Sequence, residues 1–186
     1  MATRSLDPAY RRVTVREFLA MDLGDAKAEL VDGMILMMAG GSPRHAAIAM
    51  NLGIALGNRL RGTGCRPYGS DLAIRTGEAS IRFPDVSVYC REDTRDDPAD
   101  PKLLGDPRVL FEVLSPSTAR NDQITKLAEY RARPGVRTVV FVDPENERVR
   151  VVDTAQKREA GWLATGSEVE LSTLGITLSH NEIFAE

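Results

Sequence analysis

Apolar residues recur along the chain in two spacings, and each spacing predicts a different kind of element. Between His45 and Leu60 they return every three or four residues, as at Ile48, Leu52 and Leu56. That period places them on one face of an amphipathic helix of about four turns. A second, shorter helix is expected over Thr14–Met21, because a glutamate three residues after the threonine forms a capping-box pattern.

Shorter apolar runs show the alternation and the β-branched content of strands. Ile81–Tyr89, Arg108–Ser115 and Val136–Asp143 are the clearest of these runs. A helix predicted near residues 119–131 separates the second run from the third, which indicates a right-handed parallel crossover. An Asp-Gly pair at Asp32 lies between two further apolar runs and predicts a β-hairpin.

The rest of the chain gives weaker signals. Asp71–Arg75 is expected to be a strand followed by a turn over residues 76–80, and Arg148–Asp153 is expected to pair with the strand before it. Residues 91–107 form an acidic, proline-containing loop, and the tail from 161 to 186 mixes strand, loop and a short final helix. There is no internal repeat, so we expect residues 1–186 to form a single domain.

Two of the predicted strands each contain an acidic residue, Asp85 in the first and Glu112 in the second. A carboxylate within an apolar run is costly to bury unless a partner compensates it. Two carboxylates that converge at the end of a sheet suit Mg²⁺ or Mn²⁺, which prefer oxygen ligands and keep water for a substrate. The alternative is an aspartate at a strand start and a glutamate at an edge, each solvated.

The helix that follows Glu112 adds a basic group. Asp122, Lys126 and Tyr130 are four residues apart and share one helix face. The helix begins just beyond the strand of Glu112, so Lys126 is within reach of a metal-bound water or a phosphate, whose developing charge it would stabilise. The alternative is an ordinary Asp–Lys helix pair worth about 0.3–0.5 kcal/mol.

Two more residues are candidates for the same site. Glu29 precedes the hairpin glycine, and it would be a further metal ligand or would hold a water molecule. His45 begins the long helix, where a histidine is more often a cap than a site residue, and it is kept as a supporting candidate. His180, near the end of the chain, is expected to be structural.

Composition and charge limit the class of protein. No apolar stretch approaches the roughly 20 residues that span a bilayer, and the first residues lack the apolar segment of a secretory signal. The two cysteines, Cys65 and Cys90, have no metal-type spacing, which predicts free thiols and a cytoplasmic location. The net charge is −3, but residues 44–84 contain six arginines against two acids. These arginines either contact phosphate or are scattered and solvated.

Several motifs together resemble a known family. They are ELVDG at 29–33, the helix opened by His45, PDVSV at 84–88, FEVLSPST at 111–118, and then Asp122, Lys126 and Tyr130 before GVRTVVFVDP at 135–144. This pattern resembles the restriction-endonuclease-like, or PD-(D/E)XK, nuclease superfamily. More narrowly, it is similar to a large bacterial family named for restriction endonucleases and long catalogued as a domain of unknown function. The resemblance covers residues 12 to 185.

The resemblance implies the α/β (α+β) class, with a restriction-endonuclease-like core of a central mixed β-sheet flanked by helices. It implies Mg²⁺-dependent hydrolysis of phosphodiester bonds in DNA. Asp85 and Glu112 would hold the metal, with a main-chain carbonyl near Val113 as a further ligand. The usual lysine lies two residues after the glutamate, where this chain has Leu114, and the resemblance points to Lys126 in its place.

The expected protein is therefore a metal-dependent DNA endonuclease that acts as a homodimer, each subunit cutting one strand. Three alternatives remain open at this point. The first is a non-catalytic DNA-binding module that keeps the fold, and the second is a protein-interaction domain whose acids are structural. The third is a phosphodiesterase that acts on RNA or on a small nucleotide. No partner in a membrane is expected.

Overall fold

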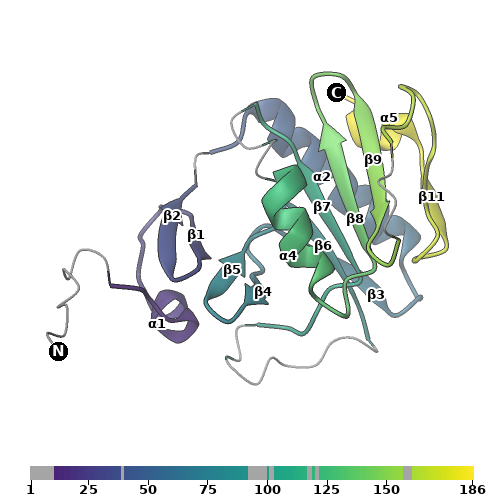
Figure 1. Ribbon diagram of the computed structural model, residues 1–186. Coiled ribbons are helices and arrows are strands. Elements are labelled where there is room, and N and C mark those ends of the chain that lie inside the picture. Colours follow the sequence, from purple (N-terminus) through teal and green to yellow (C-terminus); the bar gives the residue numbers. More distant parts are fainter. Residues whose placement is uncertain are drawn as a thin grey trace, which may run out of the picture.

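The computed structural model describes residues 11–38, 40–91, 100, 103–116, 119, 122–156 and 161–186. Their strands form three sheets (Figure 1). A five-stranded sheet has the order β3-β6-β7-β8-β9, a four-stranded sheet has the order β2-β1-β5-β4, and β10 pairs with β11. The elements are α1 (Val15–Leu19), β1 (Ala28–Val31), β2 (Met34–Met37), α2 (Pro43–Arg59), β3 (Cys65–Gly69), β4 (Ile74–Gly77), β5 (Ser80–Arg82), β6 (Val86–Cys90), β7 (Val109–Val113), η2 (Asp122–Lys126), α4 (Leu127–Arg131), β8 (Thr138–Asp143), β9 (Arg148–Asp153), β10 (Val169–Leu171), β11 (Ile176–Leu178) and α5 (His180–Phe184).

The five-stranded sheet is mixed, as the expected fold class requires. β7 and β8 run parallel, with Val109 opposite Thr138 and Val113 opposite Val142, while β6 and β9 flank them antiparallel. The strands predicted around Glu112, over 136–143 and over 148–153 are confirmed with small differences at their ends. β3 was not predicted, because its sequence contains a proline, which sheets tolerate mainly on edge strands such as this one.

Helices cover both faces of this sheet (Figure 1). On one face α2 packs with α5 and with β10 and β11, and a core forms around Leu52, Leu56 and Phe111. On the other face η2 and α4 cover a second core that includes Leu110, Leu127 and Phe141. Because alternate residues of β7 enter different cores, the strand is buried on both sides, as is typical of a parallel sheet between helices.

The four-stranded sheet contains the predicted hairpin. β1 and β2 pair antiparallel around Asp32 and Gly33, whose φ angles are 47° and 79°. A turn of this kind needs positive φ at both central residues, which Asp-Gly supplies at low cost. The helix α1 packs against this sheet, and its capping box between Thr14 and Glu17 is present as expected.

The run Ile81–Tyr89 is not one strand, contrary to the prediction. It forms β5 in the smaller sheet and β6 in the larger one, with Phe83, Pro84 and Asp85 as the link. Proline has no N–H for a ladder hydrogen bond, so it ends one strand and lets the chain change sheets. The preceding strand also lies later than predicted, because β4 extends through Gly77.

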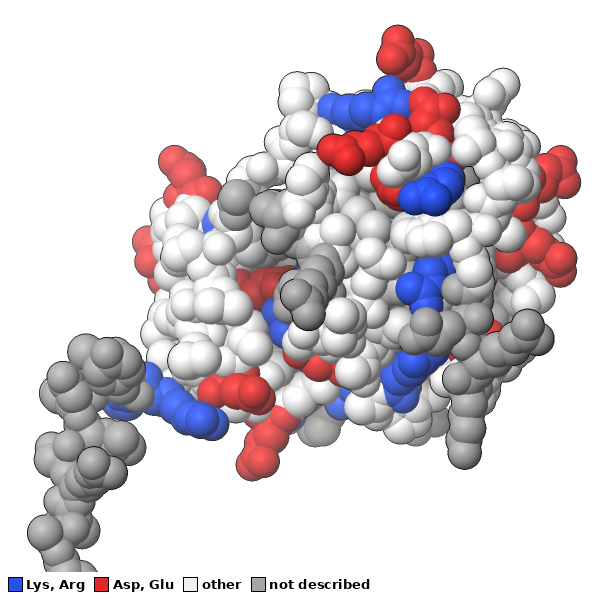
Figure 2. Space-filling view, turned by 45° about the horizontal axis from the view of Figure 1, so that its top comes forward, with Lys and Arg blue, Asp and Glu red and all other residues white. Residues whose placement is uncertain are grey.

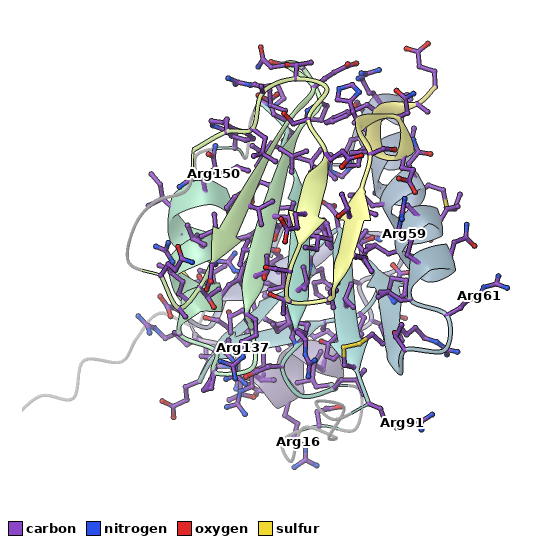
Figure 3. All side chains as sticks on the ribbon, turned by 90° about the vertical axis from the view of Figure 1, so that its right-hand side faces the viewer. Arg16, Arg59, Arg61, Arg91, Arg137 and Arg150 are labelled. Atoms are coloured by element: carbon purple, nitrogen blue, oxygen red, sulfur yellow. A yellow bond between two sulfur atoms is a disulfide. The ribbon has the colours of Figure 1, made fainter. Side chains whose placement is uncertain are left out.

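The cysteines are paired, so the expectation of free thiols is wrong. Cys65 on β3 and Cys90 on β6 lie directly opposite each other in the antiparallel ladder and form a disulfide (Figure 3). Their separation of 25 residues gives no sign of this, since it is the strand register that brings them together. Among the described residues, no helix combines the length and apolar character needed to cross a membrane.

The arginine-rich stretch does not form one basic surface. Arg82 is 1% exposed, Arg44 pairs with Glu147, and Arg59 pairs with Glu182. Figure 2 shows basic and acidic side chains interspersed among uncharged ones on the face in view. In Figure 3, Arg61 points away from the body of the protein. Several of these arginines are therefore matched to carboxylates of the chain itself, and Arg82 is inaccessible to DNA.

A pH-dependent contribution to stability is expected at α5. Glu182 accepts hydrogen bonds from Arg59 and from the Ser179 cap, and these bonds lower the pKa of Glu182 to about 2. A lowered pKa in the folded state means that the contribution is present above about pH 4.5, the ordinary value, and is lost as pH falls toward 2. We expect Glu182→Gln to lower the unfolding free energy by about 1 kcal/mol at pH 7, after discounting for solvent screening. The difference should shrink in urea titrations at pH 3, and a constant difference would contradict this account.

Candidate functional site

The candidate site lies where the chain leaves the smaller sheet and enters the larger one. Val86 on β6 faces Phe111 on β7, so Asp85 and Glu112 are the next residues outward on the two antiparallel strands. The backbone N–H of Val113 donates to Asp85 Oδ2 over 2.7 Å and fixes that carboxylate beside β7. The structure therefore brings the two acidic residues of the sequence motifs to one end of adjacent strands.

Glu112 is buried at 3% exposure on the face of β7 that η2 and α4 cover. Lys126 Nζ lies 3.3 Å from its Oε1 and 3.2 Å from its Oε2. The hydroxyl of Tyr130 donates to Oε1 over 2.5 Å. Both partners come from the helix that follows the strand, so this carboxylate is held by a lysine and a tyrosine one turn apart.

Lys126 contacts three carboxylates. Its Nζ lies 3.2 Å from Glu29 Oε1 and 3.2 Å from Asp122 Oδ1, in addition to Glu112. Its side chain is only 7% exposed. Residues Asp122–Lys126 form a π-helical turn before α4, a wider turn than the α-helix that the spacing predicts and one that recurs at functional sites. Within the helix predicted near residues 119–131, residues 120 and 121 lie outside the described residues.

The face of β7 that carries Glu112 explains how Lys126 can stand in for a lysine at position 114. Leu114 and Glu112 are two residues apart and lie on the same side, since Leu114 packs in the core that α4 covers. A lysine at position 114 would therefore reach the Glu112 side, as the usual motif requires. Here Leu114 instead packs against the helix, and Lys126 approaches Glu112 from that helix.

His45 lies beside Asp85 at the start of α2. Ser42 caps this helix by accepting from the His45 backbone N–H, and the His45 ring Nε2 is 3.4 Å from Asp85 Oδ2. The pKa of His45 is raised, first by its hydrogen bond to Asp85 and also by the Val113 carbonyl, against the opposing effect of burial. With side chains 20% and 17% exposed, His45 and Asp85 are more accessible than Glu112 and Lys126.

The buried groups perturb one another's protonation. Burial raises the pKa of Glu112 to about 8, and the charges of Asp85 and Asp122 add to this, while Lys126 and the Tyr130 hydroxyl oppose it. Burial alone would lower the pKa of Lys126, but Glu112, Glu29 and Asp122 outweigh it and raise that pKa above its ordinary value. Lys126 is therefore an ammonium ion at neutral pH.

Sequence reasoning missed two charged residues of this cluster. Arg82 donates to Glu29 over 2.8 Å and to both carboxylate oxygens of Glu129. Thr76 also donates to Glu129, over 2.8 Å. A signal was present, because Arg82 interrupts an apolar run just as Asp85 and Glu112 do.

The charges of the cluster fit a divalent cation. Two permanent cations, Lys126 and Arg82, are matched with a larger set of carboxylates, namely Asp85, Glu112, Glu29, Asp122 and Glu129. Among the described residues, no group of three or more His, Cys, Asp or Glu side chains is arranged to hold a metal by itself. Asp85, Glu112 and the Val113 carbonyl would offer only oxygen ligands, the kind that Mg²⁺ prefers when it keeps several waters.

Two proteins of known sequence resemble this chain over most of its length. An uncharacterized protein of Synechocystis sp. strain PCC 6803, slr1290, is 31% identical over 194 residues, covering 99% of this chain and 97% of that protein. A second, sll1609 of the same organism, is 28% identical over 171 residues, covering 88% of this chain and 95% of the relative.

The fold also has a match among solved structures. The crystal structure of a putative nuclease of DUF820 from Anabaena variabilis superposes with a TM-score of 0.78 at 19% identity, covering 93% of this chain and 98% of that one. At this identity the likeness establishes the fold. Residues 15–181 of this chain match the Uma2 family, described as putative restriction endonucleases. The match spans nearly the whole sequence and includes every candidate site residue, so the chain belongs to the Uma2 family.

Proposed function

We propose that this protein is a metal-dependent endonuclease that hydrolyses phosphodiester bonds in DNA, with Mg²⁺ or Mn²⁺ as its cofactor. The main support is the buried Glu112 carboxylate, which shares Lys126 with Glu29 and lies next to Asp85. Buried ion pairs are often no more stabilising than well-packed apolar residues, so a buried cluster of this many charges points to a function rather than to stability. The restriction-endonuclease description of the family supports a nucleic-acid substrate.

In this proposal Asp85, Glu112 and the Val113 carbonyl hold the metal. When bound, such a metal polarises the phosphate and lowers the pKa of water to supply the nucleophile. The excess of carboxylates around Lys126 and Arg82 would then be offset by the cation. The proton that the raised pKa of Glu112 keeps on this carboxyl must leave before the carboxylate can act as a ligand.

Lys126 acts on the transition state as a cation. Its raised pKa keeps the ammonium charged, so we assign it the role of orienting water and stabilising charge on phosphorus rather than removing a proton. Glu29 and Asp122 hold this ammonium at the Glu112 carboxylate, and Tyr130 holds Glu112 itself. In the net reaction water adds to phosphorus, a phosphorus–oxygen bond of the backbone breaks, and the leaving oxygen takes up a proton.

His45 is assigned a supporting role. It lies at the accessible side of Asp85, where a phosphate group would approach, and its charged form would favour an anion. A homodimer, in which each subunit cuts one strand, is the assembly that fits double-strand cleavage.

The test is nicking of supercoiled plasmid in Mg²⁺, in Mn²⁺ and in EDTA. The wild type should convert supercoiled to open-circular DNA only with metal, and Asp85→Asn should reduce the rate by about 10²–10³-fold. The matched control is Asp153→Asn, the same change at the far end of β9, where Asp153 is exposed and pairs opposite Thr138. This control should cut at the wild-type rate.

Two results would count against the proposal. Absence of cleavage with either metal would favour a non-catalytic module. Equal rates for Asp85→Asn and Asp153→Asn would show that any cleavage observed does not arise at this site. An RNA of matched length added as competitor separates a DNA substrate from an RNA substrate.

A further inference from the structure

Arg82 is a fully buried cation between two carboxylates. Its side chain is 1% exposed, and each of its three side-chain nitrogens donates a hydrogen bond to a carboxylate. Nε and Nη2 donate to the two oxygens of Glu129, and Nη1 donates to Glu29 Oε2 over 2.8 Å. A planar guanidinium bound in this bidentate way fixes both the distance and the orientation of its partner.

Glu129 is held from a second direction as well. The Thr76 hydroxyl on β4 donates to Glu129 Oε2, the same oxygen that accepts from Arg82 Nε. Glu129 belongs to α4, which packs beside β4 and β5 (Figure 1). These bonds therefore attach α4, which contains Tyr130 and directly follows Lys126 at the end of η2, to the smaller sheet.

Glu29 connects this pair to the candidate catalytic group. One oxygen of Glu29, Oε2, accepts from Arg82, while the other, Oε1, faces Lys126 Nζ at 3.2 Å. The carboxylate thus has one oxygen next to each cation, and Oε1 also accepts from the backbone N–H of Phe83 over 3.4 Å. Because Lys126 and Glu129 lie three residues apart on one helical segment, the contacts close a ring that runs from Glu129 through Arg82 and Glu29 to Lys126.

We propose that Arg82 and Glu129 are positioning residues, which act through Glu29 to hold the Lys126 ammonium at the Glu112 carboxylate. The inference rests on the proposed function, since it names the residues that set the geometry of that site. Without Glu129, Arg82 would keep Glu29 as its only carboxylate partner, and Glu29 would turn toward it and away from Lys126. The pair therefore affects the reaction without touching the substrate or the metal.

The test variant is Glu129→Gln, which keeps the size of the side chain and removes its charge. The matched control is Glu182→Gln, because Glu182 also accepts a bidentate arginine, Arg59, but on α5, away from the site. At saturating Mg²⁺ and below both melting temperatures, Glu129→Gln should lower kcat for nicking by about 10–100-fold. The KM for DNA and the Mg²⁺ concentration for half-maximal rate should stay at wild-type values.

A double variant separates action through Glu29 from an independent effect. If Glu129 acts through Glu29, the variant Glu29→Gln/Glu129→Gln should be no slower than Glu29→Gln alone. Multiplied effects in the double variant would overturn the proposal. So would a Glu129→Gln protein that is merely less stable and cuts at the rate of the Glu182→Gln control.

A second readout does not depend on cleavage. Acylation of lysines in the metal-free protein, followed by mass spectrometry of each peptide, reports how firmly Lys126 is held, with the exposed Lys27 as internal reference. Glu129→Gln should label Lys126 at least several-fold faster than the wild type, while Glu182→Gln should not. Unchanged labelling overturns the proposal even if the rate falls, because Glu129 would then act by another route.

The two readouts distinguish the two proposals. Faster labelling in Glu129→Gln with no cleavage by the wild type would leave the positioning pair intact and refute the nuclease. Cleavage by the wild type together with unchanged labelling of Lys126 in Glu129→Gln would support the nuclease and refute the positioning role of Arg82 and Glu129. If Glu129→Gln does not fold, Thr76→Val removes only the third hydrogen bond to Glu129 and should show both changes at smaller size.

Discussion

Lys126→Met is expected to lower the rate of plasmid nicking by about 10²–10³-fold at saturating Mg²⁺. Methionine keeps much of the length and apolar volume of the lysine stem but removes the ammonium that lies 3.2 Å from Glu112, Glu29 and Asp122. The loss should appear in kcat, because the charge stabilises the transition state and not the bound DNA.

The same substitution is expected to change how the protein responds to metal. Removing Lys126 leaves the buried carboxylates of Glu29 and Asp122 and the buried Glu112 carboxyl group without their shared cation, a loss that typically costs about 3–5 kcal/mol. Mg²⁺ would replace part of that positive charge, so it should raise the melting temperature of Lys126→Met more than that of the wild type. Lys27→Met, at an exposed lysine paired with Asp71, is the control and should match the wild type in both measurements.

Two outcomes would contradict this assignment. Wild-type cleavage by Lys126→Met would show that the lysine on the helix does not replace the one absent at Leu114. An equal response to Mg²⁺ in the variant and the wild type would show that Lys126 and the metal do not share the same carboxylates.

Glu112→Gln is expected to abolish the metal response while preserving the metal-free fold. Because burial raises the pKa of Glu112 to about 8, the metal-free protein keeps this carboxyl protonated at pH 7, and an amide resembles that form. An amide oxygen at the position of Oε1 can still accept from both the Tyr130 hydroxyl and Lys126 Nζ. The melting temperature of the variant should therefore be the same in EDTA and in Mg²⁺. That of the wild type should be higher in Mg²⁺ than in EDTA.

The pH dependence of the wild type follows from the same shift. A folded pKa near 8 lies above the ordinary value of 4.5, so the folded protein holds a proton that the unfolded chain has lost between these values. In EDTA the stability of the wild type should fall as pH rises through this window, and that of Glu112→Gln should not.

The affinity for Mg²⁺ should rise with pH, whereas the stability of the metal-free protein falls. Since Mg²⁺ must displace the proton, wild-type affinity should rise about tenfold per pH unit below pH 8. Calorimetric titrations in buffers of different ionisation enthalpy would detect the released proton. An affinity that is flat from pH 6 to 8 would show that Glu112 is already ionised or is not a ligand.

Much of the site could be read from local patterns. Asp85 and Glu112 stand out because each interrupts an apolar run of the sequence, and the four-residue spacing of Lys126 from Asp122 places both on one side of the helical segment. The hairpin at Asp32 and the strand pair around β7 and β8 follow from equally local signals. Periodicity shows which residues share a face of a strand or helix. Here it was enough to indicate that Glu112 and Lys126 lie close together.

The rest depended on contacts between distant segments. Arg82 and Glu129 are 47 residues apart and belong to different elements, so no spacing rule joins them. The same applies to Cys65 and Cys90, which meet only because β3 pairs with β6 in one register. The largest difference from the predicted fold is the change of sheet at Pro84. It places Glu29 and Arg82 of the smaller sheet against the helical segment that covers the larger one.

The central claim is that a divalent cation binds between Asp85, Glu112 and the Val113 carbonyl, with Lys126 beside it. Anomalous diffraction from crystals soaked in Mn²⁺ measures this most directly. We predict a single strong anomalous peak in contact with oxygens of both carboxylates and of that carbonyl, absent from crystals of Glu112→Gln treated in the same way. A map with no peak at this position, or with its peaks only at surface carboxylates elsewhere, would contradict the account.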